Sequence, residues 1–279
     1  MERIVVTYPL CRCSSVVADS GHTENVSSDY LSPSFLAIAH RGGATYAPNV
    51  GHENTVAAFE TALRLGYRYL ETDVHATSDG VAVAFHDERL DRVTNASGAI
   101  SELTYAQLRD VRVGGDHEVP RVDELLTAFP QARFNLDIKV PGAVAPLADV
   151  LMRTHAEDRV LVTSFSDRRL RDFRARMDRP VTLGAGTTVI ARQLLAFRMG
   201  VDRSFSAAGA LQVPAGAGPI AIVTRRFVDG AHRAGLKVHV WTVDDPTQIG
   251  DLIDLGVDGI ISDRIDVLKA VLVDRGMWE

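Results

Sequence analysis

Two histidines and three carboxylates are the residues whose types and spacing best suit catalysis. His40 and His86 stand in H-R-G and H-D, Glu71 and Asp73 are two residues apart, and Asp137 lies in a later apolar run. Imidazole changes charge near neutral pH, so the two histidines are candidates for a general acid and a general base. Ligands that offer only oxygen suit Mg²⁺ or Ca²⁺ better than zinc. The pattern predicts acid–base chemistry beside a divalent metal.

Glu71 and Asp73 lie in an extended segment, where residues two apart point to the same face. If that face is the interior of a barrel, the carboxylates repel each other unless a cation or a proton lies between them. The alternative is that both face or cap helices. Arg41 and Lys139 could contact phosphate oxygens, and their alternative role is an ion pair with these carboxylates.

Other polar and aromatic residues carry weaker signals. Trp241 ends an apolar run and could line a pocket or pack in the core; both interpretations stay open. Six further histidines are interpreted as ordinary solvated residues, although one of them, His75, lies beside the carboxylates. They are His52, His75, His117, His155, His232 and His239.

From Phe35 onward, short apolar runs alternate with amphipathic segments. The runs predict strands at 35–39, 69–74, 132–138, 159–163, 181–185, 210–213, 237–243 and 257–262. Helical periodicity begins near residue 56 and returns at 143–154, 166–176, 188–198, 225–234, 246–255 and 264–275. Eight strands alternating with helices predict an α/β fold, a (β/α)8 TIM barrel, in which catalytic residues gather at the C-terminal ends of the strands.

The connection after the second predicted strand is longer than the others. This insertion covers about residues 75–120 and contains an extra strand at 81–85, a T-S-D-G turn and a helix at 101–110 with Ser101 as its N-cap. It also carries His86, so we expect it to contribute to the site. A helix near Val122 follows it.

Composition and charge limit the class of protein. The chain has 279 residues, 46% of them hydrophobic, and a net charge of -6, and its 30 Lys and Arg are scattered. It therefore shows no basic footprint for nucleic acid or an anionic membrane. No apolar run reaches the roughly 18 residues of a transmembrane helix. The start has no convincing secretory signal, so we expect a cytoplasmic location.

Residues 1–34 are expected to form a Ser-rich N-terminal arm, packed loosely on the outside or partly disordered, before one barrel domain at 35–279. Cys11 and Cys13 are interpreted as free thiols in this arm, because a lone C-x-C is too short for a disulfide framework or a closed zinc site. The sequence does not indicate an oligomeric state.

Several motifs together resemble the glycerophosphodiester phosphodiesterase family. They are A-H-R-G-G, E-N-T, L-E-T-D-V, T-S-D-G-V-A-V-A-F-H-D, W-T-V and G-V-D-G-I-I-S-D, in the family's order over about residues 36–272. The resemblance implies a TIM barrel that uses a divalent metal, Mg²⁺ or Ca²⁺ with Mn²⁺ as a further candidate. It implies hydrolysis of a small glycerophosphodiester to sn-glycerol 3-phosphate and an alcohol.

The resemblance also implies roles for the site residues. His40 and His86 match the acid–base pair, and Glu71 and Asp73 match the metal-binding E-x-D. Asp137 stands where the family usually has Glu in E-x-K, with Lys139 matching the Lys, and Glu53 of E-N-T is expected to give a supporting polar contact. Two departures are visible: His52 replaces the usual Pro before Glu53, and Asp137 is one methylene shorter than Glu.

The attacking oxygen could come from water or from the neighbouring glycerol hydroxyl, and the resemblance to other barrel phosphodiesterases favours the hydroxyl and a transient cyclic phosphate. A rival enzyme activity is that of a lysophospholipase D or sphingomyelinase D, since D-x-K at Asp137 resembles that branch. A rival of another class is a silent barrel that only binds phosphodiesters.

Overall fold

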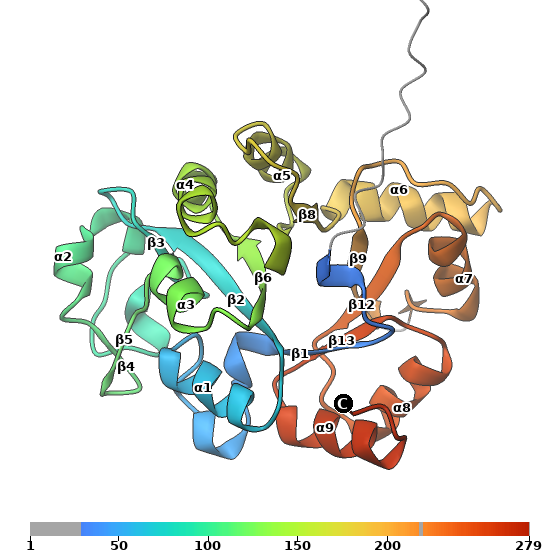
Figure 1. Cartoon of the computed structure of the whole chain (residues 1–279), viewed down its shortest axis with the longest axis horizontal. Helices are drawn as coiled ribbons and strands as arrows, with labels where there is room; N and C mark the ends of the chain where they lie inside the picture. The colour runs from blue at the N-terminus through green and yellow to red at the C-terminus, as the bar shows by residue number, and fades with distance from the viewer. Residues whose placement is uncertain (1–28, 218–219, 279) are drawn as a thin grey trace, which may run out of the picture.

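The structure is a computed structural model that describes residues 29–217 and 220–278 (Figure 1). Cys11, Cys13 and most of the predicted arm lie outside these residues. A barrel of parallel strands forms the centre of the described part, with helices around it (Figure 1). The predicted (β/α)8 fold is confirmed.

The barrel strands occur where the apolar runs predicted them. They are β1 (Leu36–Ala39), β2 (Tyr69–Ala76), β6 (Arg133–Ile138), β7 (Val160–Thr163), β8 (Thr182–Leu183), β9 (Ala210–Pro214), β12 (Lys237–Trp241) and β13 (Gly259–Ser262). Their hydrogen-bonded order is β8-β7-β6-β2-β1-β13-β12-β9. The barrel closes between β8 and β9, where Gly209 N donates to Leu183 O at 2.8 Å and Ala185 N donates to Ala210 O at 3.0 Å.

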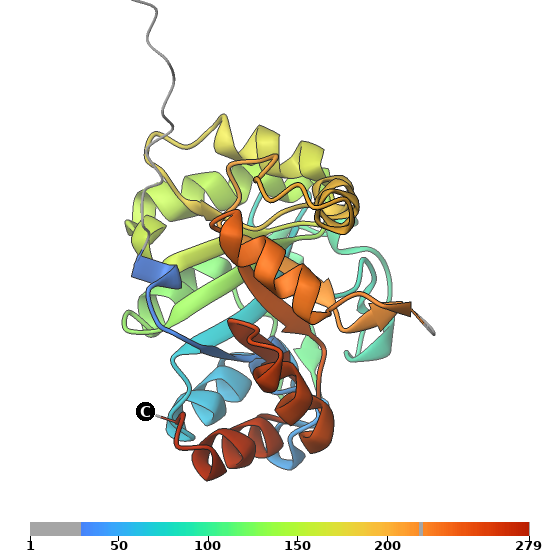
Figure 2. The ribbon, with the colours of Figure 1, turned by 90° about the vertical axis from the view of Figure 1, so that its right-hand side faces the viewer.

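Helices cover the outside of the barrel between successive strands (Figures 1 and 2). They are α1 (Val56–Arg64), α3 (Val122–Ala128), α4 (Val144–Thr154), α5 (Asp167–Arg174), α6 (Thr187–Arg198), α7 (Arg225–Arg233), α8 (Pro246–Asp254) and α9 (Ile265–Asp274). Thr55, Ser166, Thr224 and Asp245 begin four of them by accepting a hydrogen bond from a first-turn N–H. A hairpin of β10 (Gly216–Ala217) and β11 (Ile220–Ala221) separates β9 from α7.

Alternation along each strand divides the apolar core from the barrel interior. Leu70 and Val74 of β2 pack in the main hydrophobic cluster with residues of the outer helices. The intervening Glu71 and Asp73 therefore point to the opposite, interior face. Strand β2 thus directs its two carboxylates, Glu71 and Asp73, into the interior of the barrel.

Tyr30 fills the N-terminal end of the barrel. Its ring is fully buried with Leu36, Ile38 and Leu161, and it meets Tyr69 edge-on at 5.1 Å. The hydroxyl of Tyr69 donates to the Tyr30 carbonyl at 2.9 Å. The predicted loose packing of the arm is therefore wrong for Tyr30, because an isolated aromatic residue gave no periodic signal.

The insertion after β2 folds around a small core of its own. It contains β3 (Ala82–Ala84), which pairs antiparallel with β2, the helix α2 (Tyr105–Leu108), and the hairpin of β4 (Arg112–Val113) and β5 (His117–Glu118). Figure 1 places α2, β4 and β5 at one side of the barrel, beside α1 and α3. Val83, Phe85, Leu90, Ile100 and Leu108 are among its buried residues. This core holds the chain on either side of His86.

The predicted N-cap Ser101 is wrong. Thr104 caps α2, and Gln107 completes a capping box with it. Ser101 lies instead in a 3-10 turn, Ile100–Glu102. Both hydroxyl residues precede the same short helix, so a sequence pattern alone could not choose between them.

Among the described residues, no helix combines the length and apolar character needed to cross a membrane.

Candidate active site

The three carboxylates predicted from sequence lie together at the C-terminal end of the barrel. Asp73 of β2 and Asp137 of β6 are direct partners in the register, and Glu71 precedes Asp73 on the same face. All are buried and line one cavity with His40 and His86. The alternative that Glu71 and Asp73 face the helices is therefore excluded.

Lys139 lies between two of these carboxylates. Its Nζ is 2.7 Å from Asp73 Oδ1 and 2.8 Å from Asp137 Oδ2. Burial alone would raise the pKa of Asp73, but Lys139 and Arg41 outweigh it and lower that pKa below its usual range. Burial and repulsion by Asp73 raise the pKa of Glu71 to about 7. At neutral pH the carboxylate of Asp73 is therefore ionised, whereas that of Glu71 is close to half-protonated.

His40 follows β1 and is held by a carboxylate that the sequence analysis missed. Its Nδ1 is 2.8 Å from Asp263 Oδ1, and its Nε2 is 3.7 Å from Glu71 Oε2. Burial lowers the pKa of His40, but Glu71 and Asp263 outweigh burial and raise it overall. Asp263 follows β13 as His40 follows β1, and the last residues of these strands, Ala39 and Ser262, are register partners. The rule of strand ends could therefore have found it.

The loop after β1 turns sharply to bring Arg41 back over the carboxylates. Arg41 has a left-handed backbone with φ of 51°, and Gly42 follows at φ of 84°. Arg41 N donates to Glu71 Oε2 at 3.1 Å, while its Nε lies 3.3 Å from Asp73 Oδ2. A Cβ at Gly42 would collide with Ala58 of α1. This strain is tolerated because the backbone and side chain of Arg41 both find charged partners.

Asn54 is a second residue that the sequence analysis missed. It is buried at a left-handed φ of 61°. Its Nδ2 donates to Asp73 Oδ2 at 3.1 Å, and its Oδ1 accepts from Thr72 Oγ1 at 2.7 Å. Its backbone N–H donates to Arg41 O at 3.0 Å. Asn tolerates this backbone conformation better than other side chains, so E-N-T is a structural motif that fixes Asp73.

His86 reaches the cavity from the insertion and also carries an acidic partner. Its Nδ1 is 2.5 Å from Asp87 Oδ1, and Arg92 binds Asp87 in turn through Nε at 2.7 Å. His75 Nε2 lies 3.1 Å from the His86 carbonyl oxygen. The interpretation of His75 as a solvated residue is wrong, because it is buried on β2 and fixes the backbone of His86.

Glu53 lies behind the site and contacts cations. Its Oε1 accepts hydrogen bonds from Arg41 Nη1 at 3.2 Å and from Arg92 Nη2 at 2.6 Å. Burial would raise the pKa of Glu53, but Arg92 and Arg41 lower it overall. Glu53 does not line the cavity formed by the described residues, so its contact to the site runs through Arg41.

The cavity, about 480 Å³ in volume, has one charged side and one apolar side. Trp241 at the end of β12 lies on its wall, where it meets Phe165 edge-on at 5.7 Å. The apolar side continues over helix α6 and beyond β9. Its apolar lining residues include Phe165, Ile190, Ala191, Leu194, Val213, Pro214, Ile222 and Trp241.

Below the carboxylates, a chain of polar side chains crosses the barrel interior. Asn135 Nδ2 donates to Gln212 Oε1 at 3.1 Å, and Gln212 Nε2 lies 3.2 Å from His239 Nδ1. The interpretation of His239 as a solvated residue is wrong, since its ring is fully buried. Its Nε2 has no hydrogen-bond partner among the described residues.

His232 lies outside the barrel interior, on helix α7, with its Nε2 2.8 Å from Asp258 Oδ2.

Comparisons with known proteins agree with this geometry. Residues 40–267 match the model of the glycerophosphoryl diester phosphodiesterase family. The chain belongs to this family. It is 40% identical over 248 residues to a Mycobacterium tuberculosis protein named "Probable glycerophosphodiester phosphodiesterase 2", covering 88% of this chain and 93% of that protein. The matched region includes both histidines, the three carboxylates and Asp263.

Solved structures support the fold. A glycerophosphodiester phosphodiesterase from Agrobacterium tumefaciens aligns at a TM-score of 0.68 and 24% identity, covering 86% of this chain and 99% of the other. The Oleispira antarctica phosphodiesterase OLEI02445, solved with the product sn-glycerol-3-phosphate, aligns at a TM-score of 0.72 and 23% identity, covering 85% and 96%. At these sequence identities the two structures support the barrel fold of the chain and nothing beyond it.

The buried His239 gives a prediction for stability. Burial lowers its pKa to about 4 from an ordinary value of 6.5, so below pH 6.5 the unfolded chain gains a proton that the folded protein refuses. The free energy of unfolding therefore falls between pH 6.5 and 4, by on the order of 3 kcal/mol from this group. We expect His239→Gln to lose this part of the pH dependence in urea unfolding measured at a series of pH values. Equal pH dependence in wild type and variant would contradict it.

Proposed function

We propose that this protein hydrolyses glycerophosphodiesters to sn-glycerol 3-phosphate and an alcohol in the cavity at the barrel mouth. The observation that carries the proposal is the pair His40 and His86, each with its Nδ1 bound to a carboxylate, on a cavity that also holds buried carboxylates and cations. The activity named for the M. tuberculosis relative, which matches over nearly its whole length, supports the same reaction.

The two histidines divide the proton transfers. Asp263 and Asp87 orient the Nδ1 atoms, which leaves each Nε2 for the substrate. One imidazole removes the proton from the attacking oxygen, and the other gives a proton to the alkoxide that leaves when the P–O bond breaks. Arg41 and Lys139 offset negative charge on the phosphoryl oxygens.

The donor set at Glu71, Asp73 and Asp137 fits a hard divalent cation such as Mg²⁺, Ca²⁺ or Mn²⁺. Asp137 Oδ1 is buried without a hydrogen-bond partner among the described residues, and Glu71 has a raised pKa that a cation would lower. Lys139 Nζ binds Asp73 Oδ1 and Asp137 Oδ2, so Asp137 Oδ1 is the oxygen that would be open to a cation. When bound, the cation would supply Lewis acid stabilisation of the phosphoryl charge.

The apolar side of the cavity favours a second candidate substrate class. Ethanolamine and glycerol have no need of a wall built from Ile190, Leu194 and Ile222. The ammonium of choline can contact the two aromatic rings but does not need the aliphatic part of the wall. An acyl chain buried there would gain about 0.8 kcal/mol for each methylene. A lysophospholipid, cleaved to an acylglycerol phosphate and an alcohol, would place its phosphate on the charged side and its chain on the apolar side.

The reaction is tested with purified protein that has been stripped of metal by a chelator. We expect glycerophosphocholine to release sn-glycerol 3-phosphate after addition of Mg²⁺, Ca²⁺ or Mn²⁺, measured with a coupled glycerol 3-phosphate dehydrogenase assay. His40→Ala and His86→Ala should each lower kcat by about 100-fold or more, because each removes one proton transfer. His155→Asn, at an exposed histidine outside the cavity, is the control.

Failure to release the product from any glycerophosphodiester with any of the three metals would refute the proposed reaction. Full activity in either histidine variant would refute the proposed roles.

The second substrate class is tested by Leu194→Asp on the apolar wall. We expect the variant to lower the ratio of kcat/KM for submicellar lysophosphatidylcholine to that for glycerophosphocholine at least tenfold, because a charge there opposes burial of the acyl chain. Leu195→Asp is the matched control, since Leu195 is the next residue of α6 and is 60% exposed. An unchanged ratio in Leu194→Asp would leave glycerophosphodiesters without acyl chains as the substrate class.

A further inference from the structure

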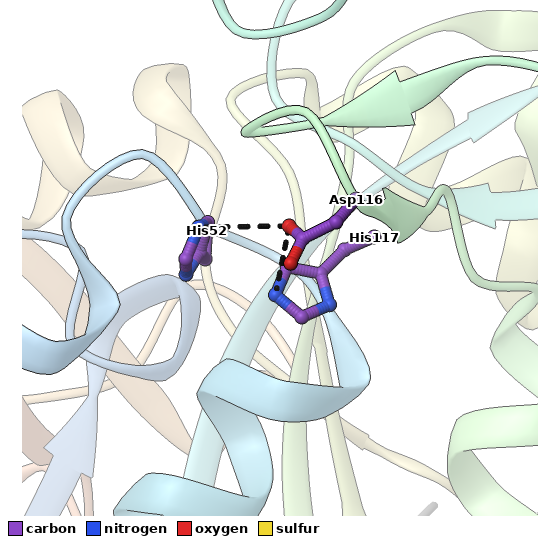
Figure 3. Close-up of side chains that lie close together, drawn as sticks. All are labelled: His52, Asp116 and His117. Atoms are coloured by element: carbon purple, nitrogen blue, oxygen red, sulfur yellow. Dashed lines mark ion pairs between the residues drawn. The ribbon is translucent and has the colours of Figure 1, made fainter.

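A second group of metal-ligating side chains lies on the surface, outside the cavity. His52, Asp116 and His117 point toward one another, His52 from the loop before α1 and the other two from the β4–β5 hairpin (Figure 3). One ligand atom from each residue lies within 4.8 Å of the others. Two imidazoles and one carboxylate form a donor set typical of zinc.

The distances between the ligand atoms of this cluster are close to those found between the ligands of a bound zinc ion. His117 Nε2 lies 3.4 Å from Asp116 Oδ1, and His52 Nε2 lies 3.9 Å from the same oxygen. Two ligands that are each about 2.0–2.1 Å from a tetrahedral zinc ion lie about 3.3 Å apart. A small movement of His52 would complete the geometry and leave a fourth position for water.

The backbone on both sides brings these residues together. Gly114 in the hairpin turn has a left-handed φ of 61°, and a Cβ there would collide with the His52 ring. On the opposite side, His52 N donates to Asn49 O at 2.8 Å, and Thr55 Oγ1 donates to His52 O at 2.7 Å. The two imidazole rings meet edge-on at 4.5 Å. The hairpin is therefore already seated on the loop before any ion binds.

The cluster joins two segments that also meet at the active site. His52 precedes Glu53, which binds Arg92 at 2.6 Å. The hairpin residue Gly114 donates its N–H to the carbonyl of Val93 at 3.0 Å, directly after Arg92. An ion bound by the cluster would add a direct link between the β4–β5 hairpin and the loop that holds His52 and Asn54. It would thereby fix the insertion against that loop.

We propose that His52, Asp116 and His117 bind a zinc ion that fastens the insertion to the loop before α1. The site is separate from the carboxylates of the cavity, because none of its three residues lines that cavity. Its role is to stabilise the position of the insertion, which carries His86.

The test is a zinc titration of the metal-stripped full chain at pH 7.5, in competition with a chromogenic chelator. We expect Asp116→Asn and His117→Ala to bind one equivalent of zinc fewer than wild type, or to bind it at least tenfold more weakly. At a hundredfold excess over Kd, zinc should raise the Tm of wild type by about 5 °C more than it raises that of the two variants.

His155→Asn, at an exposed histidine outside the cluster, should behave as wild type. Asp116 is 73% exposed at its side chain, so Asp116→Asn keeps the test valid if His117→Ala folds poorly. Equal zinc stoichiometry, affinity and Tm shift in wild type and Asp116→Asn would overturn the proposal. Because the readouts are binding and stability, this result is independent of whether the chain cleaves glycerophosphodiesters.

Discussion

The buried carboxylate of Asp73 is the group on which the arrangement of the site depends. Its side chain is 1% exposed, and it receives Lys139 at 2.7 Å, Asn54 at 3.1 Å and Arg41 at 3.3 Å. Removing one partner of a buried ion pair typically costs about 3–5 kcal/mol, because the remaining charge is left uncompensated. Arg41 and Asn54 come from the two ends of the connection between β1 and α1, and Lys139 follows β6. The charge of Asp73 therefore holds these two connections in one place.

This constraint explains why unfavourable backbone conformations occur beside the site. Arg41 and Asn54 both adopt left-handed φ values, and each gives its side chain to Asp73. The electrostatic gain offsets strain that an ordinary loop would release. Glu53 extends the same network through Arg92 to Asp87, the partner of His86. The insertion is thereby coupled to the barrel mouth by charge as well as by its own small core.

Strand positions and the main site residues were predictable because they follow local rules. Apolar runs placed the barrel strands, and strand ends placed His40, Glu71, Asp73 and Asp137. Asp263 also follows a barrel strand, but the motif that contains it, G-V-D-G-I-I-S-D, was used only as evidence for the family resemblance. The full burial of His239 depends on barrel closure, which sequence periodicity does not encode.

Contacts between residues that are distant in the sequence were the hardest to predict. Nothing near Asn54 in the sequence indicates that its amide would reach Asp73, and Tyr30 fills the barrel from outside any predicted element. His52 and His117 lie 65 positions apart along the chain and meet only because the hairpin folds back onto the loop before α1.

Glu71, Asp73 and Asp137 are the residues that we propose as the cation site of the reaction. This proposal is tested most directly by anomalous diffraction from crystals soaked in Mn²⁺ with glycerol 3-phosphate. We expect a manganese peak bonded to oxygens of these three carboxylates, including Asp137 Oδ1. A cavity that contains the glycerol 3-phosphate and shows no manganese peak at these carboxylates would contradict it.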